Sequence, residues 1–146
     1  MKVRKPIRGS RYLTGERPLN QGIQLYAEED GTIVIPTILD ERHEGPPNCV
    51  HGGFSASLID EAMGGAVWHA GYKVVAVHLD FDLRLAVPLG EEVTVRGRVE
   101  RVEGRKVYTS GEITLADGRV AVEGSGIFVE APQLFAGDAS FGNIFS

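Results

Sequence analysis

A helix that is apolar on nearly every side constrains the fold of this chain more than any other stretch of its sequence. From residue 54 onward the apolar residues cover far more than one stripe of the helix surface: Phe54, Leu58, Ile59, Ala62, Met63, Ala66, Val67 and Trp68. A helix with this pattern is buried inside a fold rather than laid on its surface. The rest of the chain is therefore expected to wrap around it.

The segments on both sides of this helix have β patterns. Residues 23–27 and 32–39 are joined by Gly31 and predict a hairpin, in which Pro36 marks an edge or a bulge. The helix should end near residues 70–71, and further strands are expected at 74–85, 92–100, 107–115 and 119–130. One long helix embraced by an antiparallel sheet of five or six strands is an α+β fold.

Two adjacent carboxylates, Asp60 and Glu61, lie in the middle of the apolar helix. A buried acid is costly unless it is paired or used in chemistry. Neighbouring helix residues point about 100° apart, so only one of the two acids can face a given cleft. We take Asp60 as the candidate for chemistry and Glu61 as structural, paired with an arginine. An ion pair at a subunit contact is the alternative reading of Asp60.

The helix begins at His51, Gly52 and Gly53. The first N–H groups of a helix have no partner within the helix, and the helix dipole is positive at this end. Because glycine leaves these N–H groups uncrowded, they can polarise a carbonyl or hold an anion.

The string HGGFSASLIDEAMGG, which starts at His51, resembles the central-helix motif of the hotdog-fold acyl-CoA thioesterases. The branch that it resembles has Asp at the ninth position after the His and includes PaaI-like and 4-hydroxybenzoyl-CoA thioesterase-like proteins. The resemblance continues through residues 77–84, 87–91 and 104–107. It implies one hotdog domain over residues 1–146, with a core at about 19–131, an N-terminal arm at 1–18 and a C-terminal tail at 132–146.

This resemblance implies hydrolysis of an acyl-CoA thioester to a free acid and CoA. Asp60 would act as general base on water or as nucleophile, and the Gly52 N–H, with Gly53 beside it, would hold the carbonyl oxygen. His51 would order the helix start. Support of the turn is assigned to Asn48, and contact with the CoA phosphates is assigned to Arg105 and Lys106, with Arg84, Arg96 and Arg98 as weaker candidates.

The spacing of Gly52 and Asp60 bears on how many chains build the site. Eight residues of helix separate them by about 12 Å along the axis, so one helix cannot bring both to one carbonyl. Two antiparallel helices in a two-fold dimer can set Gly52 of one chain against Asp60 of the other, twice. We therefore expect a homo-oligomer, either a dimer or a dimer of dimers, with shared sites.

The sequence departs from the family pattern at three positions. Many relatives carry Asn or Gln where this chain has Gly45, and Ser or Thr where it has Ala76, and the common Pro after the long strand is Ala86. Two alternatives therefore remain: a hotdog hydratase or dehydratase, and a protein that binds acyl-CoA without hydrolysing it.

Composition excludes several other classes of function. The net charge of −5 disfavours a nucleic-acid partner, and no apolar run is long enough to cross a membrane. The four histidines and the single Cys49 have no metal-ligand spacing, so neither a metal nor a cofactor is expected. The basic start of the chain is followed by no apolar segment of a secretory signal, and one cysteine suggests a reducing compartment, which together predict a cytoplasmic location.

Overall fold

The computed structural model describes residues 3–10, 13 and 23–134. These residues form one α-helix, seven β-strands and two short 3-10 helices. In chain order they are β1 (Arg4–Ile7), β2 (Leu25–Glu28), β3 (Ile33–Ile38), η2 (Glu41–His43), α1 (Gly52–His69), β4 (Val74–Leu83), β5 (Glu92–Glu103), β6 (Lys106–Leu115), β7 (Val120–Glu130) and η3 (Pro132–Leu134).

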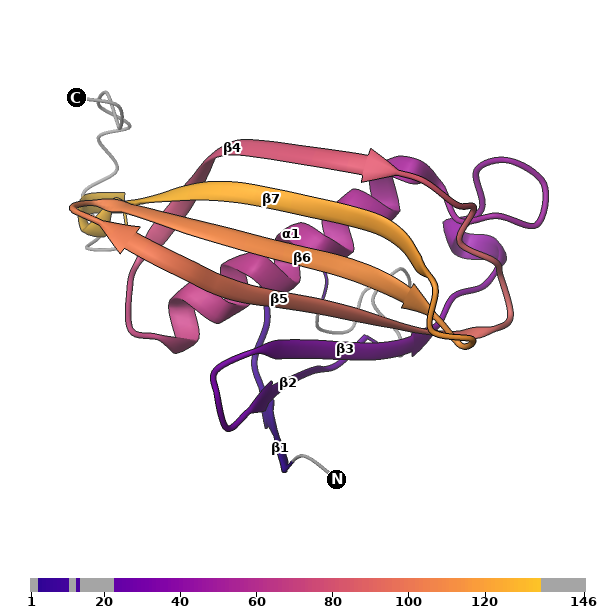
Figure 1. The fold of residues 1–146 in the computed structure, drawn as a ribbon, viewed down its shortest axis with the longest axis horizontal. Helices are drawn as coiled ribbons and strands as arrows, with labels where there is room; N and C mark the ends of the chain where they lie inside the picture. The colour runs from indigo at the N-terminus through magenta and orange to yellow at the C-terminus, as the bar shows by residue number, and fades with distance from the viewer. Residues whose placement is uncertain (1–2, 11–12, 14–22, 135–146) are drawn as a thin grey trace.

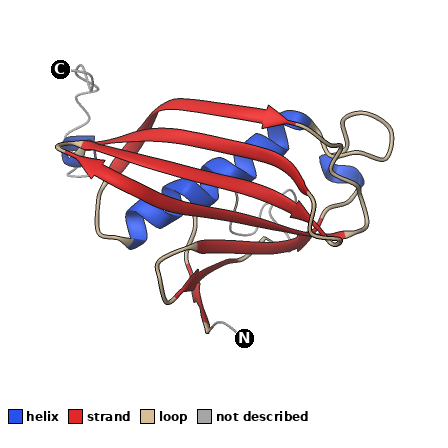
Figure 2. Cartoon of the chain, in the orientation of Figure 1, coloured by secondary structure: helices blue, strands red, loops and turns tan. Residues whose placement is uncertain are grey.

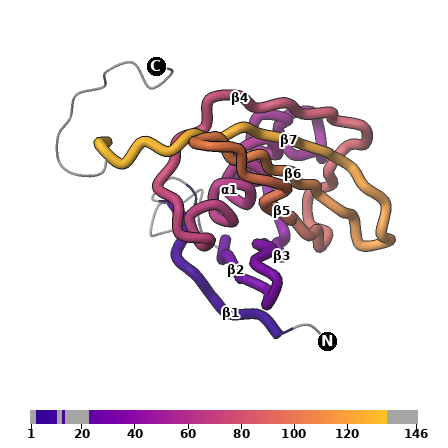
Figure 3. The backbone as a smooth tube through the Cα atoms, turned by 60° about the vertical axis from the view of Figure 1, so that its left-hand side comes forward, coloured from indigo at the N-terminus to yellow at the C-terminus, as the bar shows by residue number. Residues whose placement is uncertain are grey.

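The strands form a single antiparallel sheet in the order β1-β2-β3-β5-β6-β7-β4. Helix α1 crosses one face of this sheet, and the views in Figures 1 and 2 show it running behind the long strands β5, β6 and β7. After a 60° turn the helix lies to one side of the curved sheet (Figure 3). Strand β4 follows the helix in sequence and forms one edge of the sheet.

Close contact between α1 and the sheet depends on glycines in the middle of the strands. Gly97 on β5 pairs with Gly111 on β6, which pairs with Gly124 on β7. A Cβ atom on Gly97 would lie 2.3 Å from the carbonyl carbon of Ala62. Since real Cβ atoms do not approach backbone this closely, only glycine lets the helix backbone rest on the sheet at this point.

The helix has the bounds that the sequence predicts. It ends at His69, and Gly71 has a φ of +102°, the left-handed conformation that terminates helices at this position. Its apolar residues pack between the helix and the sheet, with Leu58, Ile59 and Met63 fully buried. Trp68 departs from the expectation, because 43% of its surface remains exposed near the end of the helix.

The sheet is larger than the five or six strands expected. Strand β1 lies in the predicted N-terminal arm and pairs with β2, with Arg4 opposite Glu28 and Ile7 opposite Leu25. Its residues are mostly exposed, so β1 lacks the apolar alternation that reveals a strand in sequence. Of the predicted tail, only residues 132–134 are described, and the packing predicted for its phenylalanines lies outside the described residues.

The prediction that Pro36 marks an edge strand or a bulge is wrong, because β3 lies between β2 and β5 in the sheet and its pairing with β5 has no bulge. Pro36 pairs in regular register with Thr94 of β5. On its other side, β3 pairs with β2 only at Ile33 and Val34. Pro36 therefore lies beyond the residues of β3 that pair with β2, which makes a proline easier to accommodate in an inner strand.

Candidate active site

The loop that leads into α1 is tightly closed on itself. The Gly45 N–H donates to the Cys49 carbonyl at 2.9 Å, and Glu44 and Val50 form an isolated β-bridge. A Cβ atom on Gly45 would lie 2.7 Å from the Cα atom of His51. A side chain at position 45 therefore cannot be accommodated in this loop, which gives a physical reason for the glycine where many relatives carry Asn or Gln.

His51 and His43 hold the start of the helix. The His51 N–H donates to the His43 carbonyl at 2.7 Å, and the His43 ring stacks on Phe54 in the first turn of α1 with centroids 4.3 Å apart. His43 is buried, and its Nδ1 lies 3.4 Å from the Asp40 N–H that donates to it. No local sequence pattern indicates this contact, because His43 and Phe54 are brought together by the loop between them.

Only one of the two glycine N–H groups at the helix start is already occupied. His51 is the N-cap, and its Nδ1 atom accepts a hydrogen bond from the Gly53 N–H at 3.0 Å. The Gly52 N–H has no acceptor within the described residues. Gly52 is partly exposed, so this N–H can be reached by a ligand. The helix dipole adds positive potential at the same position.

The two acids of α1 lie on different sides of the helix. Residues four apart share a side, which places Asp60 with Gly64 and Glu61 with Gly65. A Cβ atom on Gly64 would contact Phe128 of β7, whereas one on Gly65 would contact Leu25 of β2. Asp60 therefore lies on the side toward β7 and the edge strand β4, and Glu61 lies on the side toward β2.

Glu61 is engaged by the N-terminal segment. Both the backbone N–H and the hydroxyl of Ser10 donate hydrogen bonds to its carboxylate. The expected arginine is not among the ion pairs of the described residues. Within the described residues the partner of Glu61 is Ser10, which lies 51 residues away in sequence and could not be recognised from it.

Asp60 has no such partner in the part of the chain that the structure describes. Its carboxylate is partly buried and accepts no hydrogen bond within the described residues. Burial, which disfavours the charged form, and the negative charge of Glu61 raise the pKa of Asp60 above its ordinary value of 3.8. A carboxylate with a raised pKa is a stronger base, which is the property that general-base catalysis requires.

Within one chain, Gly52 and Asp60 do not meet. Both lie on α1, about 80° apart around the axis and about 12 Å apart along it. Both residues lie on the part of the helix surface that faces β4 and β7 rather than the middle of the sheet. A Cβ atom on Gly52 would approach Leu83 of β4, and Asp60 lies on the same side of the helix as Gly64. One chain thus keeps these two groups apart, near β4 at the edge of the sheet that the described residues form.

The remaining predicted residues are spread over both ends of the molecule. Asn48 lies at the exposed tip of the loop before α1, with a φ of +63° and its N–H bonded to the Glu44 carboxylate at 2.9 Å. Arg105 and Lys106 lie in and after the β5–β6 turn, at the end of the sheet where α1 ends (Figure 1). Both are exposed, and Arg105 donates to the Glu130 carbonyl at 3.1 Å.

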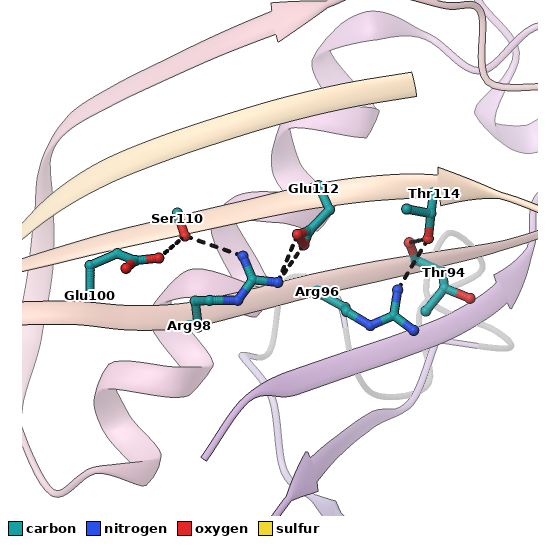
Figure 4. Close-up of polar contacts among 7 residues, drawn as sticks. All are labelled: Thr94, Arg96, Arg98, Glu100, Ser110, Glu112 and Thr114. Carbon is teal, nitrogen blue, oxygen red and sulfur yellow. Dashed lines mark hydrogen bonds and ion pairs between the residues drawn. The ribbon is translucent and has the colours of Figure 1, made fainter. Parts of the chain in front are cut away.

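The three other arginines considered for phosphate binding lie elsewhere. Arg98 donates to both carboxylate oxygens of Glu112 at 2.7 Å and to the hydroxyl of Ser110, as Figure 4 shows. Arg84 pairs with Glu123 at 2.9 Å, and Arg96 donates to the Thr114 hydroxyl at 3.2 Å. Arg98 follows Gly97, which faces α1, so its side chain lies on the opposite face of the sheet.

Ala76 and the predictions about metals and membranes complete the comparison of the sequence with the structure. Ala76 is exposed on β4 opposite Phe128, just before an irregularity in the pairing of β4 with β7. Among residues 3–10, 13 and 23–134, no group of His, Cys, Asp and Glu side chains has the arrangement of a metal site. In the same part of the chain, no helix has the length and apolar character needed to span a membrane.

Comparison with known proteins identifies relatives of this chain. The family model described as the thioesterase superfamily matches residues 48–122. Acyl-coenzyme A thioesterase THEM4 from Xenopus laevis is 39% identical over 89 residues, or 60% of this chain and 40% of that protein. The chain thus spans less than half the length of this curated relative.

Solved structures agree with this result. The crystal structure of one thioesterase superfamily protein has a TM-score of 0.74 and 36% identity, covering 77% of this chain and 55% of that chain. A hypothetical thioesterase from Streptococcus pneumoniae, crystallised with coenzyme A, has a TM-score of 0.67 and 20% identity, covering 70% of this chain and 80% of that chain. With the helix and sheet described above, these likenesses confirm the predicted hotdog fold.

Proposed function

The chain belongs to the thioesterase superfamily, and we propose that it hydrolyses an acyl-CoA thioester at a site shared by two subunits. One observation carries this proposal. Within the described residues, the Gly52 N–H has no acceptor and the partly buried Asp60 carboxylate accepts no hydrogen bond, and both groups lie on α1. They are the donor and the base that acyl transfer to water requires.

The proposed chemistry uses each group at a defined atom. The Gly52 N–H donates to the thioester carbonyl oxygen and stabilises the negative charge that develops on it. The Asp60 carboxylate takes a proton from water as the water oxygen attacks the carbonyl carbon, or attacks that carbon itself. On the general-base route the C–S bond then breaks, and the sulfur leaves as the thiol of CoA with the proton that Asp60 took from water. On the nucleophilic route the C–S bond breaks to leave an anhydride on Asp60, the sulfur takes a proton from solvent, and water then cleaves the anhydride to the free acid and the Asp60 carboxylate. His51 keeps the Gly53 N–H occupied and so orients the helix start.

A two-fold dimer would bring the two groups together. If Gly52 of one chain faces Asp60 of its partner, the axis passes near the midpoint of this interval, at Ala56. Strand β4 lies beside this part of α1, is ten residues long and pairs on only one side within the described residues. An open edge of this length is suited to pairing with a second copy. The same contact would leave room for either a dimer or a dimer of dimers.

The position of Arg105 and Lys106 supports coenzyme A as the carrier of the acyl group. With antiparallel helices, the partner's Gly52 lies level with Asp60, about 14 Å along the axis before the end of α1. The β5–β6 turn lies at that end. In coenzyme A a long pantetheine arm separates the thioester from the phosphates, which suits two exposed cations at this distance. The relative from Streptococcus pneumoniae was crystallised with coenzyme A.

This function requires neither a metal nor a cofactor beyond the CoA of the substrate. We also place the protein in the cytoplasm, on the basis of its single cysteine, Cys49.

The hydratase or dehydratase alternative needs a His and an acid that both move protons on the acyl chain. His51 fits that role poorly, because its Nδ1 atom is used as a helix cap. Ala76, which offers no hydroxyl to hold water, favours the binder that lacks turnover.

A panel of acyl-CoAs assayed with a thiol reagent tests the proposal. Purified protein should release CoA thiol from at least one short, long or aromatic acyl-CoA, and EDTA should leave the rate unchanged. Hydration of a crotonyl-type substrate without thiol release would favour the hydratase. Tight binding of acyl-CoA with no turnover of any member of the panel would overturn the proposed hydrolysis and favour the binder.

A further inference from the structure

The edge strand β4 carries a row of apolar side chains on the face of the sheet that bears α1. Leu79, Phe81 and Leu83 lie opposite Gly126, Gly124 and Val122 of β7. Cβ atoms on these two glycines would touch both the row and the helix. The row therefore borders α1 rather than the outer face of the sheet.

Two members of this row are unusually exposed for large apolar residues beside a core helix. Leu79 is 38% exposed and Leu83 is 55% exposed, whereas Val122 on the neighbouring strand is fully buried. Exposed apolar groups next to a polar site are typical of surfaces that bind an apolar part of a ligand.

Leu83 is the member that lies closest to the start of the helix. Its Cδ2 atom is 2.9 Å from the position that a Cβ atom on Gly52 would occupy. The Gly52 N–H is the group to which the carbonyl oxygen is assigned above. A ligand whose carbonyl accepts from this N–H therefore places its first acyl carbons within reach of the Leu83 side chain.

We propose that Leu83 is a specificity-determining residue, which limits the bulk that the substrate can carry on the carbon next to the thioester carbonyl. This inference rests on the proposed hydrolysis and deepens it by naming the substrate class: acyl groups that are apolar and unbranched beside the carbonyl. Leu79 lies farther along α1, near Met63, and therefore borders more distant carbons of the acyl chain.

The test compares two isomeric acyl-CoAs, one straight and one branched next to the carbonyl, at the chain length that the wild type hydrolyses fastest. Leu83→Ala should raise the ratio of kcat/KM for the branched over the straight isomer by about 10-fold, the scale of discrimination by small changes in an apolar pocket. Leu83→Phe should lower the same ratio. A ratio of rates for isomers is insensitive to a general loss of active protein.

Ile38→Ala is the matched control. Ile38 is a similarly exposed aliphatic residue, 62% exposed, and alternates with the buried Thr37, so it lies on the face away from α1. Its substitution should leave the ratio unchanged. Equal scaling of both isomers in the Leu83 variants, with the fold and assembly state preserved, would overturn the role of Leu83 while leaving hydrolysis established. A wild type that hydrolyses no acyl-CoA would instead overturn the proposed function, and this inference with it.

Discussion

Asp60 and Glu61 are neighbours on α1, but only Glu61 has a hydrogen-bonding partner within the described part of the chain. Ser10 donates two hydrogen bonds to Glu61, and the carboxylate of Asp60 accepts none. The helix directs Glu61 toward the N-terminal segment and Asp60 toward the open edge of the sheet. This difference assigns a structural role to one acid and leaves the other available for chemistry.

Substitution of the two acids should therefore have unequal effects on turnover. Asp60→Asn keeps the shape of the side chain but removes the base, and kcat should fall on the order of 10²-fold or more. In Glu61→Gln the amide oxygen can still accept from the Ser10 N–H and the amide NH2 can donate to the Ser10 hydroxyl, so kcat should fall less. Steady-state thiol release checks both variants, and circular dichroism checks their folds. Equal losses, or full activity of Asp60→Asn, would reverse the assignment.

The pH dependence of hydrolysis should reflect the raised pKa of Asp60. Because the carboxylate must be ionised to act, kcat/KM should fall as the pH drops through a pKa above the ordinary 3.8. The charge of Glu61 contributes to this elevation, so Glu61→Gln should move the acidic limb to lower pH. Glu123→Gln, which removes an acid from the Arg84 ion pair, serves as the control. A limb that stays in place or moves to higher pH in Glu61→Gln would contradict this account.

The same pKa predicts how Asp60 affects stability. Protonated Asp60 is neutral in both the folded and unfolded states at low pH, whereas above its raised folded pKa the folded protein must hold a poorly solvated charge. Asp60→Asn should therefore raise Tm at neutral pH, and the gain should shrink as the pH falls toward the ordinary pKa. Calorimetry across pH checks this, with the exposed Asp80→Asn as control. A loss of Tm at neutral pH would show that the charge is stabilised by contacts.

The helix–sheet contact can be tested by stability alone. Gly97→Ala would place a Cβ atom 2.4 Å from the Met63 nitrogen, and backbone cannot yield as a side chain does. We expect a loss of about 3 kcal/mol or more in the free energy of unfolding, at the upper end of overpacking effects. Gly64→Ala adds a methyl group 3.4 Å from Phe128 and should be neutral or stabilising by up to about 1 kcal/mol. Urea denaturation measures the free energy of unfolding of both variants. An unchanged value for Gly97→Ala would argue against this packing of the helix on the sheet.

The parts of the fold that are buried in a regular pattern could be predicted from the sequence. The bounds of α1 and the strands from β3 to β7 follow from apolar periodicity and from turn residues such as Gly118. Strand β1 could not be found in this way. Its exposed residues and Pro6 carry no periodic signal, and its existence depends on the pairing with β2.

In the candidate site, too, only the contacts between residues close in sequence could be predicted. Local contacts, such as the His51 cap on the Gly53 N–H, follow from helix geometry and could be anticipated. The contact of Ser10 with Glu61 and the approach of Leu83 to Gly52 join residues that are far apart in sequence. Such pairs depend on how the sheet and the N-terminal segment close around α1, which no local pattern specifies.

The central claim is that each site takes Gly52 from one chain and Asp60 from another. Asp60→Asn and Gly52→Pro provide two defects on different halves of the site. Proline at Gly52 removes the N–H but suits the first position of a helix. His51 before it has a φ of −56° and a ψ of 131°, the extended conformation that a residue preceding proline adopts. Circular dichroism and Tm first confirm that both variants fold.

The decisive measurement is the activity of the two inactive variants after they are dissociated, mixed and reassembled, with exchange monitored by a tag on one chain. In a mixed dimer one site receives both defects, and the other receives an intact Asp60 and an intact Gly52. The account predicts that activity returns to about a quarter of the wild-type value, because half of the dimers are mixed and half of their sites are whole. Demonstrated exchange between folded chains with no return of activity would contradict the shared site and would require that one subunit assembles the chemistry alone.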